Sequence, residues 1–184
     1  MTEPVRRRSS ELVVLSILAL GIFEGRSAAP QLLGPEFQVN SYTTRFQFGA
    51  AVAADASGNF VVVWTSQGQD GFRDGVIGQR FDANGLPLGS EFKVNSYSTG
   101  YQNDPAVAAD ASGGFVVAWQ SLYQDGSYTG VFAQRFDPAG LPLGPEFRVN
   151  THTTDGQFDP AVAVAATGEF VVVWSSYLQD GSYV

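Results

Sequence analysis

Aspartates followed by glycine recur along this 184-residue chain and are the first residues whose type and spacing could do chemistry. The sequence Gln-Asp-Gly occurs three times, with Asp70, Asp125 and Asp180 at its centre. Asp74 follows the first copy closely, so Asp70 and Asp74 could share a calcium ion, which prefers hard oxygen ligands. The second copy has Thr129 at the position of Asp74, and turn formation by Asp-Gly is the alternative. We therefore predict no obligatory cofactor and keep calcium binding at these aspartates as a hypothesis.

All seven tyrosines lie in or at the edge of the long connecting segments, some of which carry these aspartates. Sugar rings stack on aromatic faces while carboxylates and amides bind their hydroxyl groups, so a glycan or a protein is the partner to expect. The candidate ligand-binding residues are Tyr97, Tyr101, Tyr123, Asp125, Tyr128 and Tyr177. The alternative is that these rings pack against neighbouring repeats and keep only their hydroxyl groups in water. The three tryptophans are expected in the core.

Residues suited to catalysis are few. His152 is the only histidine, cysteine is absent, and no Gly-x-Ser-x-Gly sequence occurs. These absences remove thiolate catalysis, disulfides and cysteine-based zinc sites. A pair of carboxylates could still hydrolyse a glycoside, but equivalent aspartates in successive repeats favour a scaffold. We predict that the chain is not an enzyme, with a fragment of a glycoside-acting enzyme as the alternative.

A repeat of 55 residues must position all of these groups. Its centre is the sequence Phe-Val-Val-Val-Trp or a close variant, at 60–64, 115–119 and 170–174. A continuous β-branched and aromatic run indicates a strand that is buried on both faces. For the middle copy we expect strands at 106–110, 115–121, 131–137 and 147–150.

Two kinds of connection alternate between these strands. Tight Asp-x-x-Gly turns join the first strand to the second and the third to the fourth, while long loops make the other connections. Alternate connections of an up-and-down sheet lie at opposite ends. The loops that carry the tyrosines should therefore meet at one end of the molecule.

Four-stranded antiparallel meanders repeated without gaps are typical of β-propeller blades. We predict an all-β fold of such blades in an incomplete ring, with a two-layer β-sandwich as the alternative. The full repeats span about 50–104 and 105–159, and the partial repeats span 34–49 and 160–184. An incomplete ring leaves open strand edges, through which self-association is expected.

The first 29 residues have the order of a secretory signal peptide: Arg6, Arg7 and Arg8, an apolar run at 12–23, then small residues at 27–29. This order predicts a secreted or cell-surface β-repeat domain at 30–184, with the periplasm as an alternative, and no membrane association beyond the signal peptide. Residues 30–184 retain six of the ten basic and fifteen of the eighteen acidic residues, a net charge of −9. Such a surface disfavours nucleic acid, which requires a basic footprint.

The phrase FVVVWxSxxQDG, followed by QRFDxxGxPLGxEFxVN, resembles a tandem repeat of about 55 residues from large secreted bacterial surface proteins. The resemblance extends from about Gly34 to the end of the chain. It implies secretion, β-rich blades and a structural or adhesive role. We therefore predict a secreted structural or adhesive repeat protein that could bind through its tyrosine-rich loops, with a glycan-binding, lectin-like propeller as the alternative.

Overall fold

The computed structural model describes Val14–Leu15 and residues 36–179 of the chain. Strands are the only regular elements in this part, and none of it forms a helix that could span a membrane. The strands are β1 (Val14–Leu15), β2 (Phe37–Gln38), β3 (Gln47–Ala54), β4 (Phe60–Gln67), β5 (Asp74–Phe81), β6 (Phe92–Lys93), β7 (Gln102–Ala109), β8 (Phe115–Leu122), β9 (Thr129–Phe136), β10 (Phe147–Arg148), β11 (Gln157–Val164) and β12 (Phe170–Ser176).

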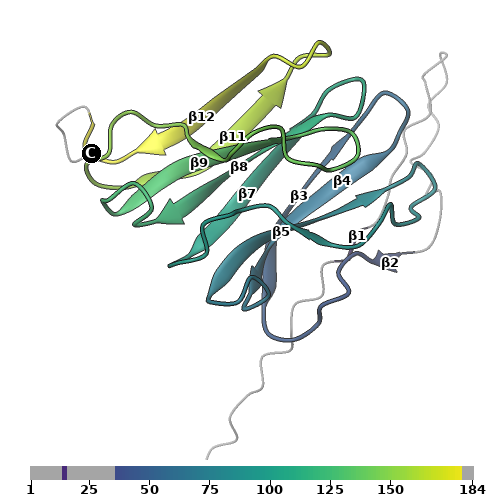
Figure 1. The fold of residues 1–184 in the computed structure, drawn as a ribbon, viewed down its shortest axis with the longest axis horizontal. Coiled ribbons are helices and arrows are strands. Elements are labelled where there is room, and N and C mark those ends of the chain that lie inside the picture. The colour runs from purple at the N-terminus through teal and green to yellow at the C-terminus, as the bar shows by residue number, and fades with distance from the viewer. Residues whose placement is uncertain (1–13, 16–35, 180–184) are drawn as a thin grey trace, which may run out of the picture.

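The strands form antiparallel sheets in the order of the chain. The first sheet is β3-β4-β5-β6, the second is β7-β8-β9-β10, and β11 and β12 form a third, two-stranded sheet. Figure 1 shows these three sheets side by side, from blue through green to yellow, with β1 and β2 on the far side of the first sheet. The predicted four-stranded meander is confirmed.

The first strand of each sheet begins earlier than the sequence indicated. In the second sheet β7 begins at Gln102, four residues before the expected start, and its pairing with β8 shifts between Asn103 and Ala106. Pro105 lies in this bulge, where the missing N–H group interrupts no ladder. The strand therefore continues through the bulge, which adds residues 102–105 to the predicted strand.

The fourth strand of both four-stranded sheets is shorter than expected. β10 covers two residues, because the side-chain Oδ1 of Asn150 accepts the Val131 N–H at 2.8 Å in place of a backbone carbonyl. Asn95 does the same for Val76 at 2.7 Å. The Asn of the repeated Val-Asn pair thus ends the ladder with its side chain.

Alternate residues of the central strand pack against different neighbours. Val61 and Val63 of β4 share a core cluster with Val117 and Trp119 of β8. The residues between and beside them, Val62 and Trp64, lie in a second cluster with Phe37 and Val39 of the β2 segment. Each apolar run is therefore buried on both faces because it separates two neighbouring sheets.

Phenylalanines join each sheet to the next in a repeated arrangement. Phe115 and Phe136 stack within the second sheet with ring centroids 4.8 Å apart, and Phe92 of the first sheet lies 5.5 Å from Phe136. Phe37 lies 5.6 Å from Phe81 in the same way. The sheets thus stack as propeller-type blades that do not close into a ring in the described part of the chain. Because three sheets follow one another, the two-layer sandwich is not formed.

Little of the predicted signal peptide belongs to the described residues. Val14–Leu15 pairs with β2, and Leu15 faces Phe37 as Gly78 faces Phe92 in the first sheet. β1 therefore lies beside β2 as β5 lies beside β6. The rest of the segment 1–29 lies outside the described residues, so the signal peptide and the domain boundaries stay predictions.

Candidate ligand-binding surface

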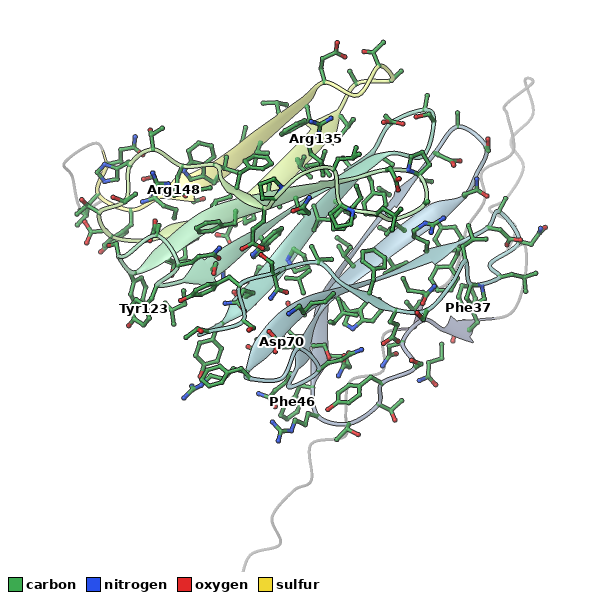
Figure 2. The ribbon with its side chains drawn as sticks, viewed as in Figure 1. Phe37, Phe46, Asp70, Tyr123, Arg135 and Arg148 are labelled. Atoms are coloured by element: carbon green, nitrogen blue, oxygen red, sulfur yellow. The ribbon has the colours of Figure 1, made fainter. Side chains whose placement is uncertain are left out.

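The long loops meet at one end of the blades, which we call the loop end. They are the segments 68–73, 94–101, 123–128 and 149–156. Parallel bridges join Asp74 to Tyr101 and Thr129 to Gly156, so each loop lies against the start of the following sheet. Figure 2 shows Phe46, Asp70 and Tyr123 along this end of the molecule, away from Arg135.

A cation and two rings form the first cluster of the loop end. The guanidinium group of Arg73 donates a hydrogen bond to Tyr101 Oη, and its Cζ lies 4.9 Å from the Tyr101 ring centroid. The same Cζ lies 5.7 Å from the centroid of Phe72, which is 52% exposed. This contact between a cation and ring faces orients Tyr101 at the boundary between the first and second sheets.

Three rings form the second cluster, at the boundary between the second and third sheets. Tyr128 contacts Tyr123 and Phe158 edge to face, and both pairs of ring centroids lie 6.3 Å apart. Tyr123 and Tyr128 are 60% and 54% exposed. Tyr128 occupies the position of Arg73 in its repeat, so one repeated position supplies a cation to one boundary and a ring to the next.

Asp74 is the buried carboxylate of the loop end. It begins β5, is only 7% exposed, and its Oδ1 has no hydrogen-bond partner among the described residues. Burial raises the pKa of Asp74, the negative charges of Asp70 and Asp104 raise it further, and a hydrogen bond from Gln67 opposes them.

Asp104 lies in the bulge of β7, at a position that recurs in every sheet. Gly49, Asp104 and Asp159 share this position, with φ of 63°, 51° and 51°. A Cβ on Gly49 would lie 3.7 Å from Asp104 Oδ1, so the position is adjacent from one sheet to the next. The left-handed backbone admits Asp at modest cost, because its short polar side chain bonds locally.

The carboxyl groups of Asp104 and Asp159 influence each other. Desolvation raises the pKa of Asp104, the Asp159 charge raises it further, and a hydrogen bond donated by Gln120 lowers it. Sequence reasoning missed both residues. The sequence feature that could have indicated them is the pair Asp-Pro, repeated at 104–105 and 159–160. Such a pair usually indicates a turn, so it does not by itself predict a bulge within a strand.

The aspartates of Gln-Asp-Gly form turns. Asp70 Oδ1 accepts the Phe72 N–H at 3.1 Å, and Asp125 Oδ1 accepts the Ser127 N–H at 3.1 Å. Asp125 Oδ2 also accepts a hydrogen bond from Asn150 at 3.3 Å, whereas Asp70 Oδ2 is buried with no hydrogen-bond partner within residues 36–179. Asp180 lies outside the described residues.

Calcium binding at these aspartates stays a prediction. Within residues 36–179, no three or more His, Asp or Glu side chains converge in a way that could hold a metal ion. Asp70 and Asp74 are the two members of the predicted set that interact electrostatically. A calcium ion there would take its remaining ligands from backbone carbonyls or water.

The predicted tyrosines separate into different environments. Tyr101 contacts Arg73, and Tyr123 and Tyr128 contact each other. Tyr97 is half-buried, and its backbone N–H donates to Glu146 at 3.3 Å. Tyr177 is 52% exposed, and its N–H donates to the Gly156 carbonyl at 2.9 Å. The structure thus brings Tyr123 and Tyr128 together, while Tyr101 lies in the other cluster, against Arg73.

Other repeated polar residues hold the loops in place. Glu146 accepts hydrogen bonds from the backbone of Ser96 and from Gln124 Nε2, both at 2.6 Å, and Glu91 accepts from Ser41 and Gln69 in the same way. These glutamates were not predicted as structural residues. The Gln of Gln-Asp-Gly is therefore used by the fold rather than offered to a ligand.

Two of the three tryptophans belong to the core, as expected: Trp64 and Trp119 are 0% exposed. Trp174 is half-buried. Trp64 Nε1 donates to Gln47 Oε1 at 3.0 Å, and Trp174 repeats this bond to Gln157 at 3.3 Å. These rings leave the tyrosines and Phe72 as the aromatic surface of the loop end.

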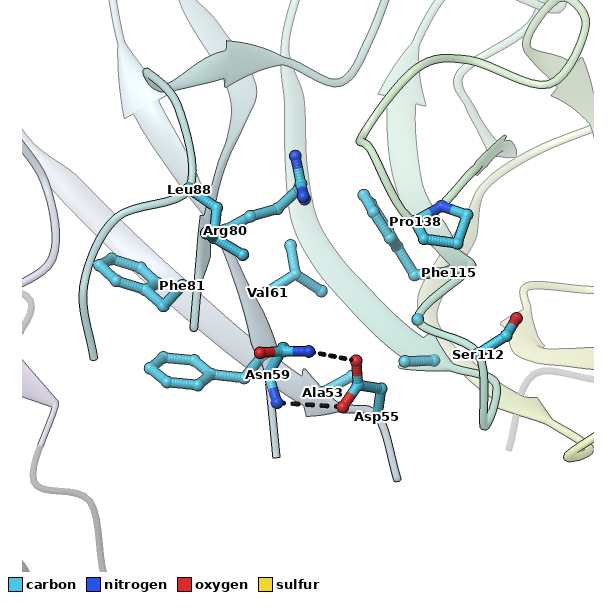
Figure 3. Close-up of a pocket in the computed structure, with 13 residues that line it drawn as sticks. Ala53, Asp55, Asn59, Val61, Arg80, Phe81, Leu88, Ser112, Phe115 and Pro138 are labelled. Carbon is cyan, nitrogen blue, oxygen red and sulfur yellow. Dashed lines mark hydrogen bonds between the residues drawn. The ribbon is translucent and has the colours of Figure 1, made fainter. Parts of the chain in front are cut away.

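A pocket of about 110 Å³ lies at the opposite end, between the first and second sheets. Figure 3 shows Asp55 and Asn59 hydrogen-bonded to each other beside Arg80 and Phe115. Arg80 donates to the carbonyl of Ala139, so the polar groups of the pocket are already used. An equivalent hollow recurs between the second and third sheets. The pocket therefore follows from the stacking of tight turns and is not the candidate site.

Comparisons with known proteins give no family. No family model matches the chain, and no curated protein matches its sequence. Among solved structures, the chain is similar to an endo-arabinase from Bacteroides thetaiotaomicron, with 13% identity, a TM-score of 0.48, and coverage of 77% of this chain and 56% of the other. It is also similar to an α-L-arabinofuranosidase from Lactobacillus brevis, with 14% identity, a TM-score of 0.47, and coverage of 76% and 48%.

The chain spans about half the length of these two proteins. Its own strands define it as an all-β protein of stacked antiparallel blades. Its candidate site is the loop end, where exposed rings lie at the boundaries between sheets and the partly desolvated carboxyl groups of Asp74 and Asp104 lie at the first boundary.

Proposed function

We propose that this protein is a secreted structural or adhesive repeat protein that binds a neutral glycan through its loop end. The observation that carries the proposal is the repeated pairing of rings with carboxylates at each boundary between sheets. Arg73 and Tyr101 lie near Asp74 and Asp104 at the first boundary. At the second boundary Tyr128 contacts Phe158, which directly precedes Asp159 in the chain.

The chemistry of these groups suits a sugar better than other ligands. Rings that are more than half exposed leave apolar faces in water, and a stacked sugar ring would cover them while its hydroxyl groups stay hydrated. Carboxylates such as Asp104 accept hydrogen bonds from those hydroxyl groups. The net charge of −9 for residues 30–184 disfavours an anionic ligand.

The two boundaries suggest an extended ligand. The same backbone bridges repeat from one sheet to the next, so two subsites with different side chains lie side by side along the loop end. A glycan of several residues would contact both, and the second contact would act at a high effective concentration. We therefore expect oligosaccharides to bind more tightly than single sugars.

A glycan array with the full chain tests the proposal. We expect binding to a set of neutral oligosaccharides, and we expect Tyr128→Ala to weaken that binding. Leu141→Ala is the matched control, because Leu141 is also exposed (63%) but lies at the tight-turn end. No binding to any glycan, or equal binding by Tyr128→Ala and wild type, would contradict the proposal.

A second candidate function is glycoside hydrolysis by Asp104 and Asp159. The observation that favours it is the raised pKa of Asp104, caused by desolvation and by the charge of Asp159. Glycosidases use two carboxyl groups, and desolvation or a neighbouring negative charge raises the pKa of the one that acts as the general acid. A panel of chromogenic glycosides tests it: turnover that Asp104→Asn abolishes supports hydrolysis, and no turnover on the panel removes it.

A further inference from the structure

Each sheet has two faces with different neighbours. We call the side that packs on the preceding sheet the front face and the opposite side the rear face. On the rear face of the first sheet, Val61 and Val63 are 4% and 0% exposed. Val116 and Ala118 occupy the same positions in the second sheet and are 4% and 0% exposed. Both rear faces are covered because another sheet follows.

The rear face of the third sheet is open. Val171 and Val173 are the repeats of the buried valines just described, yet they are 58% and 59% exposed. Ala161 and Ala163 pair with them across β11 and β12 and are also exposed. Four apolar side chains thus lie together on a face whose two counterparts in the same chain are core.

The front face of the first sheet is open over its first strand. In the second sheet, Val107 and Ala109 of the front face pack into the core against the first sheet. Their counterparts in β3, Val52 and Ala54, are exposed, and Val52 is 50% exposed. Phe37 and Val39 of the β2 segment cover the neighbouring part of this face, over Val62 and Trp64, and leave β3 uncovered.

The two open faces are the two halves of one interface. Between the first and second sheets, rear residues Ala51, Ala53, Val61 and Val63 meet front residues that include Val107 and Ala109. The open rear face carries Ala161, Ala163, Val171 and Val173 at the first set of positions. The open front face carries Val52 and Ala54 at the second set.

We propose that the rear face of β11–β12 in one copy of this chain docks on the front face of β3–β4 in a second copy. The contact would continue the stacking of the sheets across the boundary between two chains. It is heterologous, because it joins different surfaces of the two copies, so it builds a closed ring or an open filament rather than a symmetric dimer. This inference concerns assembly and does not depend on glycan binding.

Two substitutions block the two halves separately. Val173→Asp places a charge on the rear face and Val52→Asp places one on the front face, where burial of an unpaired charge is strongly unfavourable. Both positions are exposed within one chain, so folding should survive, and an unchanged circular dichroism spectrum and melting curve would verify it. Leu86→Asp is the control, because Leu86 is 63% exposed and belongs to a tight turn outside both faces.

The test is the mass of the full chain by size exclusion with light scattering. We expect the wild type and Leu86→Asp to form oligomers whose mass rises with concentration, while Val173→Asp and Val52→Asp stay monomeric. An equimolar mixture of the two monomeric variants should form a dimer, because each retains the half that the other has lost.

Three results would overturn the proposal. A monomeric wild type at all concentrations would mean that a second copy does not cover the open faces, as would be the case if another protein or a further repeat did so. Val52→Asp with wild-type mass would indicate docking between two rear faces. A mixture that stays monomeric would show that the two faces do not fit each other. If one variant failed to fold, Val171→Asp or Val52→Lys would replace it in the same comparison.

Discussion

Tyr128 contacts Phe158 across the boundary between the second and third sheets, with ring centroids 6.3 Å apart and ring planes at 69°. The two residues are 30 positions apart in the sequence and belong to different sheets, since Tyr128 directly precedes β9 and Phe158 lies in β11. The aromatic surface of the loop end is therefore built at boundaries, and neither sheet could form it alone. This relationship makes glycan binding depend on how the sheets stack.

The contact predicts that Phe158→Ala weakens glycan binding even though Tyr128 itself is unchanged. Removing the edge contact leaves the exposed Tyr128 ring free to leave its position, and such ring pairs contribute about 0.5–1.5 kcal/mol. We expect the affinity to fall by about 2- to 12-fold in isothermal titration calorimetry. Leu86→Ala at the tight-turn end should bind as the wild type does. Equal affinity for Phe158→Ala and Leu86→Ala would show that this pair does not hold the site.

Repeated asparagines offer a matched pair for stability. Asn95 Oδ1 accepts the Val76 N–H at 2.7 Å, whereas the equivalent Asn40 Oδ1 is buried and has no hydrogen-bond partner in the described part of the chain. Asn95→Ala would leave a buried N–H unpaired, which costs about 1–3 kcal/mol. We expect urea denaturation to show a larger loss for Asn95→Ala than for Asn40→Ala. Equal losses would mean that the cap on Val76 is not what the repeated Asn contributes.

The raised pKa values predict a pH dependence of stability. Because the folded state raises the pKa of Asp104 above 3.8, the folded protein binds more protons than the unfolded chain just above that pH. Stability from this group is therefore lost as the pH rises through its folded pKa. We expect Asp104→Asn to increase the melting temperature more at pH 7 than at pH 4. Asn tolerates the positive φ of this position and keeps an acceptor for Gln120, so the backbone is preserved. An increase of the same size at both pH values would contradict this account.

For Asp82 the pH dependence of stability has the opposite sign to that for Asp104. The hydrogen bond from the Leu86 backbone N–H is the largest cause that lowers the pKa of Asp82. The carboxylate also accepts the Asn84 backbone N–H within its tight turn, which lowers the pKa further. A lowered pKa adds stability above the unfolded value that is lost as the pH falls. Asp82→Asn should therefore lower the melting temperature at pH 7 and have less effect at acid pH. A loss of the same size at both values would point to lost turn geometry rather than lost charge.

Calcium binding is tested by melting experiments with and without the ion. If Asp70 Oδ2 and Asp74 Oδ1 share calcium, the ion should raise the melting temperature, since it binds the folded state alone. Asp70→Asn should remove the rise. Asp125→Asn is the control, because Asp125 Oδ2 already accepts a hydrogen bond from Asn150. A melting temperature that neither calcium nor a chelator moves would exclude this site.

The sequence predicted the blade but not its details. The apolar runs predicted the bounds of the central strands to within about one residue. A strand between two sheets is buried on both faces, so its apolar run is not interrupted by polar residues. The aspartates at 55, 82, 110 and 137 were correctly read as turn formers, since each accepts backbone N–H groups within its turn. Local chemistry decides such positions, so a single sequence is sufficient for them.

The remaining differences arise from contacts between repeats. Asp104 was missed because its function in the surface depends on a bulge and on Asp159 of the next sheet. The structural use of Glu91 depends on Ser41, 50 positions earlier. β1 was not predicted at all, because its segment reads as a signal peptide and its pairing with β2 is distant in the sequence. Spacing alone does not show which side chains meet across two sheets.

The most direct test of the central claim is the affinity of a double variant for an oligosaccharide that the wild type binds. Tyr101→Ala with Tyr128→Ala removes one ring from each boundary, while Leu86→Ala with Leu141→Ala removes two exposed side chains from the opposite end. We predict that the tyrosine variant loses at least about tenfold in affinity by calorimetry and that the leucine variant keeps the wild-type value. Unchanged affinity in the tyrosine variant would contradict a glycan site at the loop end.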